Sequence, residues 1–439
     1  MIRIPQKLTY KSSSLSVLTY IIVGVSLFVT FCSLNKRSFG AVCAALSLIL
    51  IVSNFTEGNM MKWAPFAIVG AIATALLVLS GKMSLRGFNA PILHTLKFIY
   101  LMFTVSLAIG MDSLTRIQKK RVLQGVLISV LISTLISLYN VILVDKYAIR
   151  YYESRGFTTV FDFSQFYAIC LLLCALFFAV ISFRRKARIW PYVLLTGAIF
   201  ACVGLSLYTT GILLSALGIG MAIAIRRYTV ARNRVILWVT ALAFLVILVY
   251  FFRQQISDWV YRITKPINWI LRDRLRSVVD TILRTEHTLS YNHDRRDELA
   301  GYSLTSFRQH PLFGIGYAGY GYGTIGCHQE WQDMLGVFGL VGTGIFVALM
   351  VFLSVQVLRK TETRTDATAF VLVLLLFIAL GFLNPCLSLP VLSVVFIIAP
   401  NISVLFDPQL VGGNIWDIRL LRRRDGIGPA YEKGGIERC

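Results

Sequence analysis

Long apolar runs alternate with short polar segments along almost the whole chain. Each run is close to the ~20 residues that an α-helix needs to cross the ~30 Å hydrocarbon core of a bilayer. The pattern predicts an all-α, polytopic membrane helix bundle of about twelve transmembrane helices. The runs lie near 15–34, 39–53, 63–80, 90–111, 122–144, 161–183, 190–207, 211–225, 235–252, 334–358, 368–384 and 386–405.

Two stretches break this pattern. Between the ninth and tenth runs, residues 253–332 carry many polar residues, and we expect a long, partly helical loop there. A basic tail, residues 406–439, follows the last run. No other polar stretch approaches the size of a separate soluble domain, so residues 1–405 are expected to form a single transmembrane bundle domain.

Composition and charge agree with a membrane protein and set its orientation. The chain has 56% hydrophobic and 15% charged residues, too few polar groups to cover a water-soluble globule. The net charge of +22 comes from short basic clusters between the apolar runs, which favours membrane topology over nucleic-acid binding. With the N-terminus inside, cytoplasmic segments hold about 25 of the basic residues, so both termini are expected in the cytoplasm and the long loop outside.

One charged residue lies inside a predicted span. Lys97 falls in the run 90–111, where a lysine at the bilayer centre costs roughly 2.5–3.5 kcal/mol on insertion scales. Such a residue is a candidate for a functional cavity. The alternative is that its amine extends to the outer surface, about 10 Å away by helix rise.

The end of the long loop carries two further features. Its Gly-rich segment, PLFGIGYAGYGYGTIG from Pro311 to Gly326, contains a formal G-x-G-x-x-G match, but without a preceding strand this does not indicate a dinucleotide site. The glycines permit close backbone approach to an anion or sugar, or simply form a flexible loop. His328 follows at the mouth of the bundle, where it is either a general base or a hydrogen-bonded structural residue. Glu330 and Asp333 beside it are expected to be solvated acids at a helix start, with orientation of His328 or sugar binding as the alternatives.

Several of these residues together resemble a known signature. Arg296 is followed by Phe307, by His310 and by Pro311-Leu312-Phe313-Gly314-Ile315-Gly316, and His328 is followed by Gly339-Leu340-Val341-Gly342. Upstream, ESRGFTTVFDFSQFYA from Glu153 contains an arginine-glycine pair at the start of a span. This arrangement resembles the O-antigen ligase and Wzy-type O-antigen polymerase superfamily of bacterial polytopic membrane glycosyltransferases.

The resemblance implies a function and a set of roles. Members transfer a glycan from an undecaprenyl-pyrophosphate carrier to an acceptor hydroxyl, on the outer face of the bacterial cytoplasmic membrane and without metal or other cofactor. His328 would be the general base, and Arg296 would stabilise the leaving pyrophosphate as a second catalytic residue. The eight cysteines lack metal-ligand spacing, in keeping with a metal-independent enzyme.

One departure concerns the donor site. The family often has a Ser-Arg-Gly-like turn between two close spans, and this chain reads Tyr208-Thr209-Thr210-Gly211 there. The missing cation leaves four candidates for donor pyrophosphate binding: Arg155, Arg296, Lys97 and Arg150. The candidates for sugar binding are Glu330, Tyr317 and Tyr320.

Three functions are compatible with these observations. The first is a repeat-unit polymerase for a surface polysaccharide, with lipid-linked oligosaccharide, acceptor glycan and membrane lipid as ligands, and a chain-length regulator and flippase as further partners. The second is a ligase that moves the glycan onto lipid A core or protein. The third is a lipid-linked oligosaccharide flippase, which the lack of a visible internal repeat disfavours.

Overall fold

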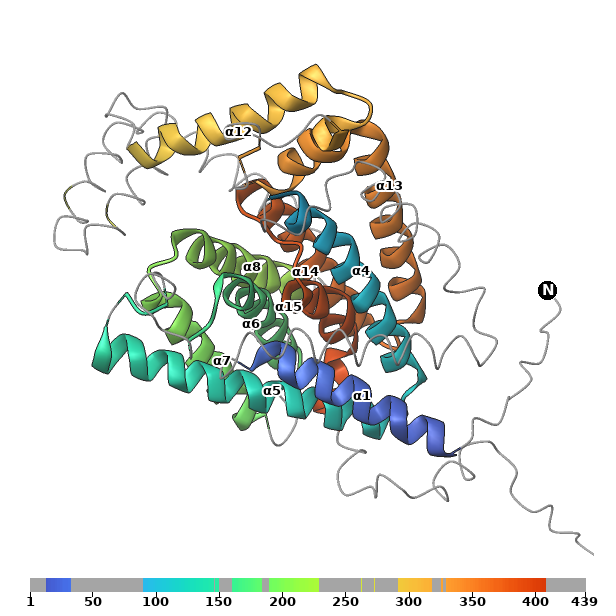
Figure 1. Ribbon diagram of the computed structural model, residues 1–439. Coiled ribbons are helices and arrows are strands. Elements are labelled where there is room, and N and C mark those ends of the chain that lie inside the picture. Colours follow the sequence, from blue (N-terminus) through green and yellow to red (C-terminus); the bar gives the residue numbers. More distant parts are fainter. Residues whose placement is uncertain are drawn as a thin grey trace, which may run out of the picture.

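The computed structural model describes residues 13–32, 90–145, 147–149, 160–183, 189–228, 262, 272, 291–317, 325–326 and 329–407. Within these ranges the ordered elements are helices, with no strand, as the all-α prediction requires. The elements are α1 (Ser13–Phe31), α4 (Ala90–Ser113), α5 (Arg116–Tyr139), η1 (Asn140–Val144), α6 (Phe163–Phe183), α7 (Trp190–Leu205), α8 (Thr209–Tyr228), α12 (Tyr291–Gln309), η2 (Gly314–Tyr317), α13 (Glu330–Lys360), α14 (Arg364–Leu383), α15 (Leu389–Ser393), η3 (Val394–Ile398) and η4 (Ala399–Phe406) (Figure 1).

The described helices match the predicted apolar runs. Five helical segments are long and apolar enough to cross a membrane: Arg116–Val144, Phe163–Phe183, Glu330–Lys360, Arg364–Leu383 and Leu389–Phe406. Shorter apolar helices cover the runs of α1, α4, α7 and α8. Three predicted runs, 39–53, 63–80 and 235–252, lie outside the described residues. The chain is therefore a helical membrane protein, and the number of twelve spans stays a prediction.

The core is formed by α6 and by the last apolar helical segment, Leu389–Phe406. In the most apolar part of these two segments, 72% and 89% of the residues are buried, compared with 28% for α13. A helix that is apolar on every side must be covered either by other helices or by lipid, and these two are covered by helices. On α13, Leu340, Val347 and Val351 are exposed, a surface suited to lipid.

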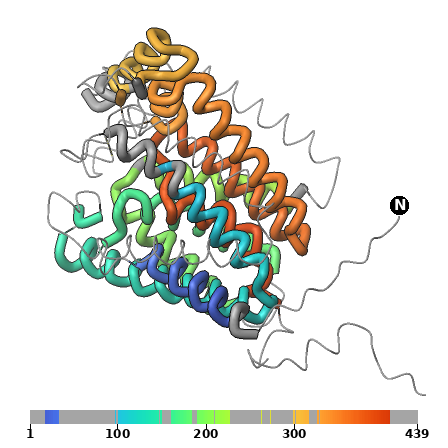
Figure 2. Tube along the Cα trace, turned by 45° about the vertical axis from the view of Figure 1, so that its right-hand side comes forward, coloured from blue at the N-terminus to red at the C-terminus, as the bar shows by residue number. Residues whose placement is uncertain are grey.

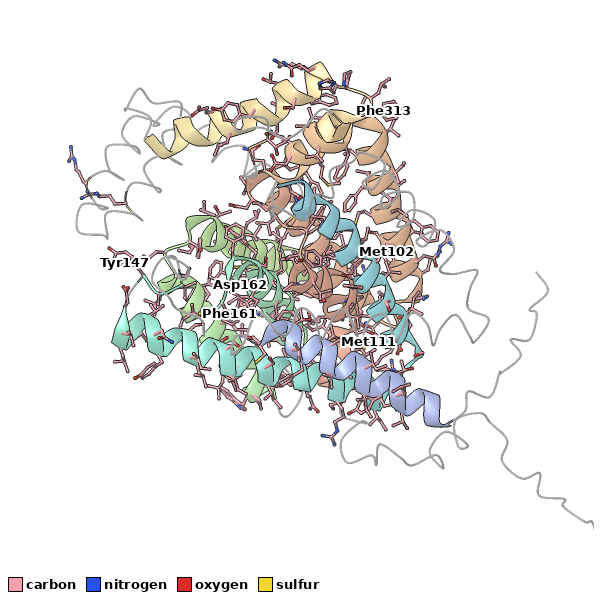
Figure 3. The ribbon with its side chains drawn as sticks, viewed as in Figure 1. Met102, Met111, Tyr147, Phe161, Asp162 and Phe313 are labelled. Atoms are coloured by element: carbon pink, nitrogen blue, oxygen red, sulfur yellow. The ribbon has the colours of Figure 1, made fainter. Side chains whose placement is uncertain are left out.

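Contacts bring together the helix ends that the topology prediction places on one side. At one end, Lys360 Nζ at the close of α13 lies 2.5 Å from Asp112 Oδ2 at the close of α4. At the other end, the Gln165 side-chain amide at the start of α6 donates to the Cys32 carbonyl after α1, at 3.3 Å. Figure 3 labels Asp162, just before α6, and Met111, near the end of α4. Which end faces the cytoplasm stays a prediction.

Helix α12 lies outside this bundle and across its end. It belongs to the predicted long loop and packs on the first part of α13 (Figures 1 and 2). The tenth apolar run begins near residue 334, and the helix that carries it, α13, begins at Glu330. Because α12 and the start of α13 meet at the same end as the start of α4, charged residues far apart in sequence converge there.

Candidate functional site at the end of the bundle

The structure describes part of the predicted site. Lys97 and Glu330 are described in full. Arg296 lies in α12 and Tyr317 in η2, by their positions in the chain. The other candidates fall outside the described residues: Arg150, Arg155, Tyr320 and His328. His328 directly precedes Gln329, the residue that caps α13.

The two glycine motifs of the sequence are docked on each other. The Leu340 and Val341 amides, in the G-L-x-G motif, donate to the carbonyls of Pro311 and Leu312, in P-L-x-G-x-G, at 2.8 and 3.0 Å. This contact is between backbones, and it requires the absence of side chains at Gly314 and Gly339. We call these backbone contacts the glycine interlock.

Glycine is needed at both positions for two reasons. Gly314 and Gly339 have φ of 66° and 61°, the left-handed region that other residues rarely adopt. A Cβ on Gly314 would overlap the Val337 carbonyl, and one on Gly339 would lie 2.5 Å from the Leu312 carbonyl oxygen. Gly339 also has ψ of −166°, so it breaks the helical backbone of α13 and separates residues 330–338 from the rest of that helix. We call residues 330–338 the first segment of α13.

A buried ion pair holds the beginning of the first segment. Lys97 Nζ lies 2.5 Å from Glu330 Oε1, and the two side chains are 11% and 0% exposed. The other oxygen, Glu330 Oε2, accepts hydrogen bonds from the Cys386 and Leu387 amides at 2.8 and 3.0 Å. One carboxylate therefore connects α4, α13 and the turn between α14 and α15.

A second buried carboxylate, one turn further, connects α13 to α12. Ser303 Oγ on α12 donates to Asp333 Oδ1 at 2.6 Å and accepts from the Gly326 amide at 3.0 Å. Asp333 Oδ2 accepts from the Gln329 amide at 3.1 Å. Ser303 and Asp333 thus contact the two described residues that flank positions 327 and 328. The chain on either side of His328 is anchored to α12 and α13.

These contacts correct one expectation and sharpen another. Glu330 and Asp333 were expected to be solvated acids, and both are buried because protein donors replace their water. The Lys97 amine does not extend to the surface but meets Glu330. Lys97 and Glu330 as donor and sugar ligands stay predictions.

Arg296 lies in α12, seven residues before Ser303. The Ser303 hydroxyl is buried against Asp333. Arg308, five residues after Ser303, falls on another face and is exposed.

Sequence reasoning missed Ser303 and the pairing of Lys97 with Glu330. A serine in a polar helix carries no signal of its own. The Lys97–Glu330 pair did have a signal in the sequence. The topology prediction places the start of the span 90–111 and the start of the span 334–358 at the same outer surface. Two opposite charges at the same depth in neighbouring helices favour a pair, because each is costly alone.

Three side chains near this carboxylate network have a buried polar atom without a partner among the described residues. Gln329 Oε1, Gln332 Oε1 and Asn384 Nδ2 are buried atoms that make no hydrogen bond with any described residue. Asn384 ends α14, two residues before the Cys386 amide that binds Glu330. Buried amides of this kind normally have a hydrogen-bond partner.

Comparison with known proteins adds no identity. No protein-family model matches the chain, and no curated protein matches it. Among the described residues no group of three or more His, Cys, Asp or Glu side chains could hold a metal ion.

Proposed function

We propose that this protein is an extracytoplasmic membrane glycosyltransferase that moves a glycan from an undecaprenyl-pyrophosphate carrier to an acceptor sugar hydroxyl. The polymerisation of repeat units of a surface polysaccharide is the activity we favour. The observation that carries the proposal is the glycine interlock, which joins the two motifs on which the family resemblance rests. Spacing in the sequence alone did not require these motifs to touch.

The elements that carry the proposed catalytic residues also converge. Arg296 belongs to α12, and His328 precedes the first segment of α13, to which α12 is bonded through Ser303 and Asp333. The side-chain oxygens of Gln329 and Gln332, which make no hydrogen bond with a described residue, lie at the start of the same segment, where hydroxyl groups of a glycan would find partners.

In the proposed reaction, the acceptor oxygen attacks the anomeric carbon of the donor sugar while the bond from that carbon to the pyrophosphate oxygen breaks. The electron pair of the broken bond leaves with the pyrophosphate, and Arg296 and Arg155 stabilise its charge through bidentate hydrogen bonds. Neutral His328 takes the proton of the attacking hydroxyl, a contribution of roughly 10²–10⁴ in rate. A single displacement inverts the anomeric configuration.

The test is a reconstituted assay with purified protein in vesicles and undecaprenyl-pyrophosphate oligosaccharide as the substrate. A ladder of product lengths supports the polymerase. Product that forms only after lipid A core is added favours the ligase, and transbilayer movement without new glycosidic bonds favours a flippase.

Matched variants test the assigned residues in the same assay. His328→Ala and Arg296→Ala should abolish transfer. Arg308→Ala is the control, because this residue is exposed and lies in α12. Full transfer by either first-named variant contradicts the role given to that residue.

A further inference from the structure

The Lys97–Glu330 pair occupies a place where charges are expensive. Removing two ions from water costs several kcal/mol each, and well-packed apolar residues of similar size often stabilise a protein as well or better. A buried pair is therefore poor support for stability alone. It does fix geometry, because each charge has one low-energy position, opposite the other.

The geometry fixed here is that of the first segment of α13. Gly339 interrupts the helix, so residues 330–338 are not positioned by the continuing α13 backbone. Three side chains hold this segment instead, each against a different neighbour. Glu330 binds Lys97 and the α14–α15 turn, the Trp331 indole donates to the Ile378 carbonyl of α14 at 2.8 Å, and Asp333 binds Ser303 of α12.

In sequence, Glu330 is the member of this set nearest the proposed base, two residues after His328. Its carboxylate pairs with Lys97 Nζ and accepts hydrogen bonds from the Cys386 and Leu387 amides. A Lys97 amine at 2.5 Å from a carboxylate has its charge compensated, and this weakens its attraction for a pyrophosphate.

We infer that Lys97 and Glu330 are positioning residues, which together set the place of His328 relative to the acceptor hydroxyl. The inference rests on the proposed function, since it gives the pair a role through the catalytic base. It assigns Lys97 to Glu330 rather than to the donor pyrophosphate.

The experiment is a double-mutant cycle with Lys97→Met, Glu330→Gln and the combined variant. Each single variant should lower kcat by about 100-fold, the effect of misplacing a catalytic group by about 1 Å, with little change in the KM for the donor. The combined variant leaves neither charge unpaired and should recover at least about tenfold of kcat. Recovery is the decisive result, because a residue that binds the donor directly cannot be rescued by removing its neighbour.

A spectroscopic readout separates this inference from the proposed function. Of the five histidines, labelled with ¹³C in the imidazole, His328 is assigned by the signal lost in His328→Asn. Its chemical shift should move in each single variant and return toward the wild-type value in the combined one. This holds whether or not the wild-type protein transfers glycan, so inactivity in the assay overturns only the proposed function.

Asp112→Asn and Lys360→Met form the matched control, since that pair joins the same two helices at their other ends. Both should keep kcat and the His328 signal unchanged.

Lys97→Arg keeps the charge but changes the length and shape of the donor. It should accumulate in the membrane even if the single variants do not, with a lowered kcat, an unchanged donor KM and a shifted His328 signal. A raised donor KM with an unmoved His328 signal, or no recovery in the combined variant, overturns the inference.

Discussion

Ion pairs join helices α4 and α13 at both ends, and the two ion pairs differ in burial. Lys97 with Glu330 and Asp112 with Lys360 have the same nitrogen–oxygen distance of 2.5 Å. The side chains of the second pair are 45% exposed for Lys360 and 34% for Asp112, whereas Glu330 is completely covered. Equal distances therefore do not mean equal roles. Breaking a buried pair by removing one partner typically costs about 3–5 kcal/mol, and an exposed pair contributes about 0–1 kcal/mol.

The surroundings of the two ion pairs extend the contrast. At the Lys97–Glu330 end, backbone amides and carbonyls complete the contacts, through the glycine interlock and the Cys386 and Leu387 amides. At the other end, long charged side chains dominate: Arg116 bonds Glu362, and Lys119 Nζ lies 3.6 Å from the same residue. Backbone contacts in a buried site allow little adjustment, while exposed long side chains allow much. We conclude that the first end is built for a defined geometry and the second for general cohesion.

The largest expected effect is at the glycine interlock. Gly339→Ala should lower the free energy of unfolding by several kcal/mol, since strained backbone costs about 1–3 kcal/mol and overpacking about 1–3 kcal/mol more. Gly314→Ala should lower the free energy of unfolding by a similar amount. The control is Gly344→Ala in the same helix, where an added Cβ meets nothing within 4 Å. Thermal unfolding in detergent measures the difference. Equal midpoints for Gly339→Ala and Gly344→Ala would show that the interlock is not rigid.

A smaller effect is expected at Ser303. Ser303→Ala removes the donor to Asp333 and the acceptor for the Gly326 amide, and leaving buried groups unsatisfied costs about 1–3 kcal/mol. Thr305→Ala is the control, because Thr305 lies exposed on the same helix. Hydrogen exchange at the Gly326 and Gln329 amides should speed up in the first variant alone. Unchanged exchange at both amides would contradict the anchoring of the residues around His328.

The smallest effect is expected at Glu362, and its comparison with Asp366 tests whether burial, rather than the end of the bundle, causes the contrast. Asp366 and Glu362 lie four residues apart near the start of α14, at the Lys360 end. Asp366 is buried and accepts from the Ser403 amide at 2.8 Å and from the Ser403 hydroxyl at 2.6 Å, whereas Glu362 is exposed.

Asp366→Ala should therefore lower the free energy of unfolding by about 1–3 kcal/mol. Glu362→Ala should change stability by less than about 1 kcal/mol, an amount that falls further in high salt. Unfolding midpoints at low and high salt distinguish the two variants. Similar losses for both would mean that position along the bundle matters more than burial.

The helices themselves were predictable because apolar run length is a local property. The apolar run alone did not mark the start of α13, since Glu330, Gln332 and Asp333 are polar in sequence and yet belong to the helix. Their burial could not be read from the sequence. A carboxylate is solvated or buried according to whether donors from other elements reach it, and here Lys97, Ser303 and the Cys386 amide do.

The sequence by itself determined that this is a helical membrane protein, where most of its apolar helices lie, and that its charged and glycine-rich residues gather near the segment before α13. These properties follow from composition and spacing along the chain. The tertiary structure decided that the two glycine motifs touch, that Gly339 breaks α13, and that Lys97 meets Glu330. Those contacts join residues up to 233 positions apart, from 97 to 330, and only the packing of helices brings such groups within hydrogen-bonding distance.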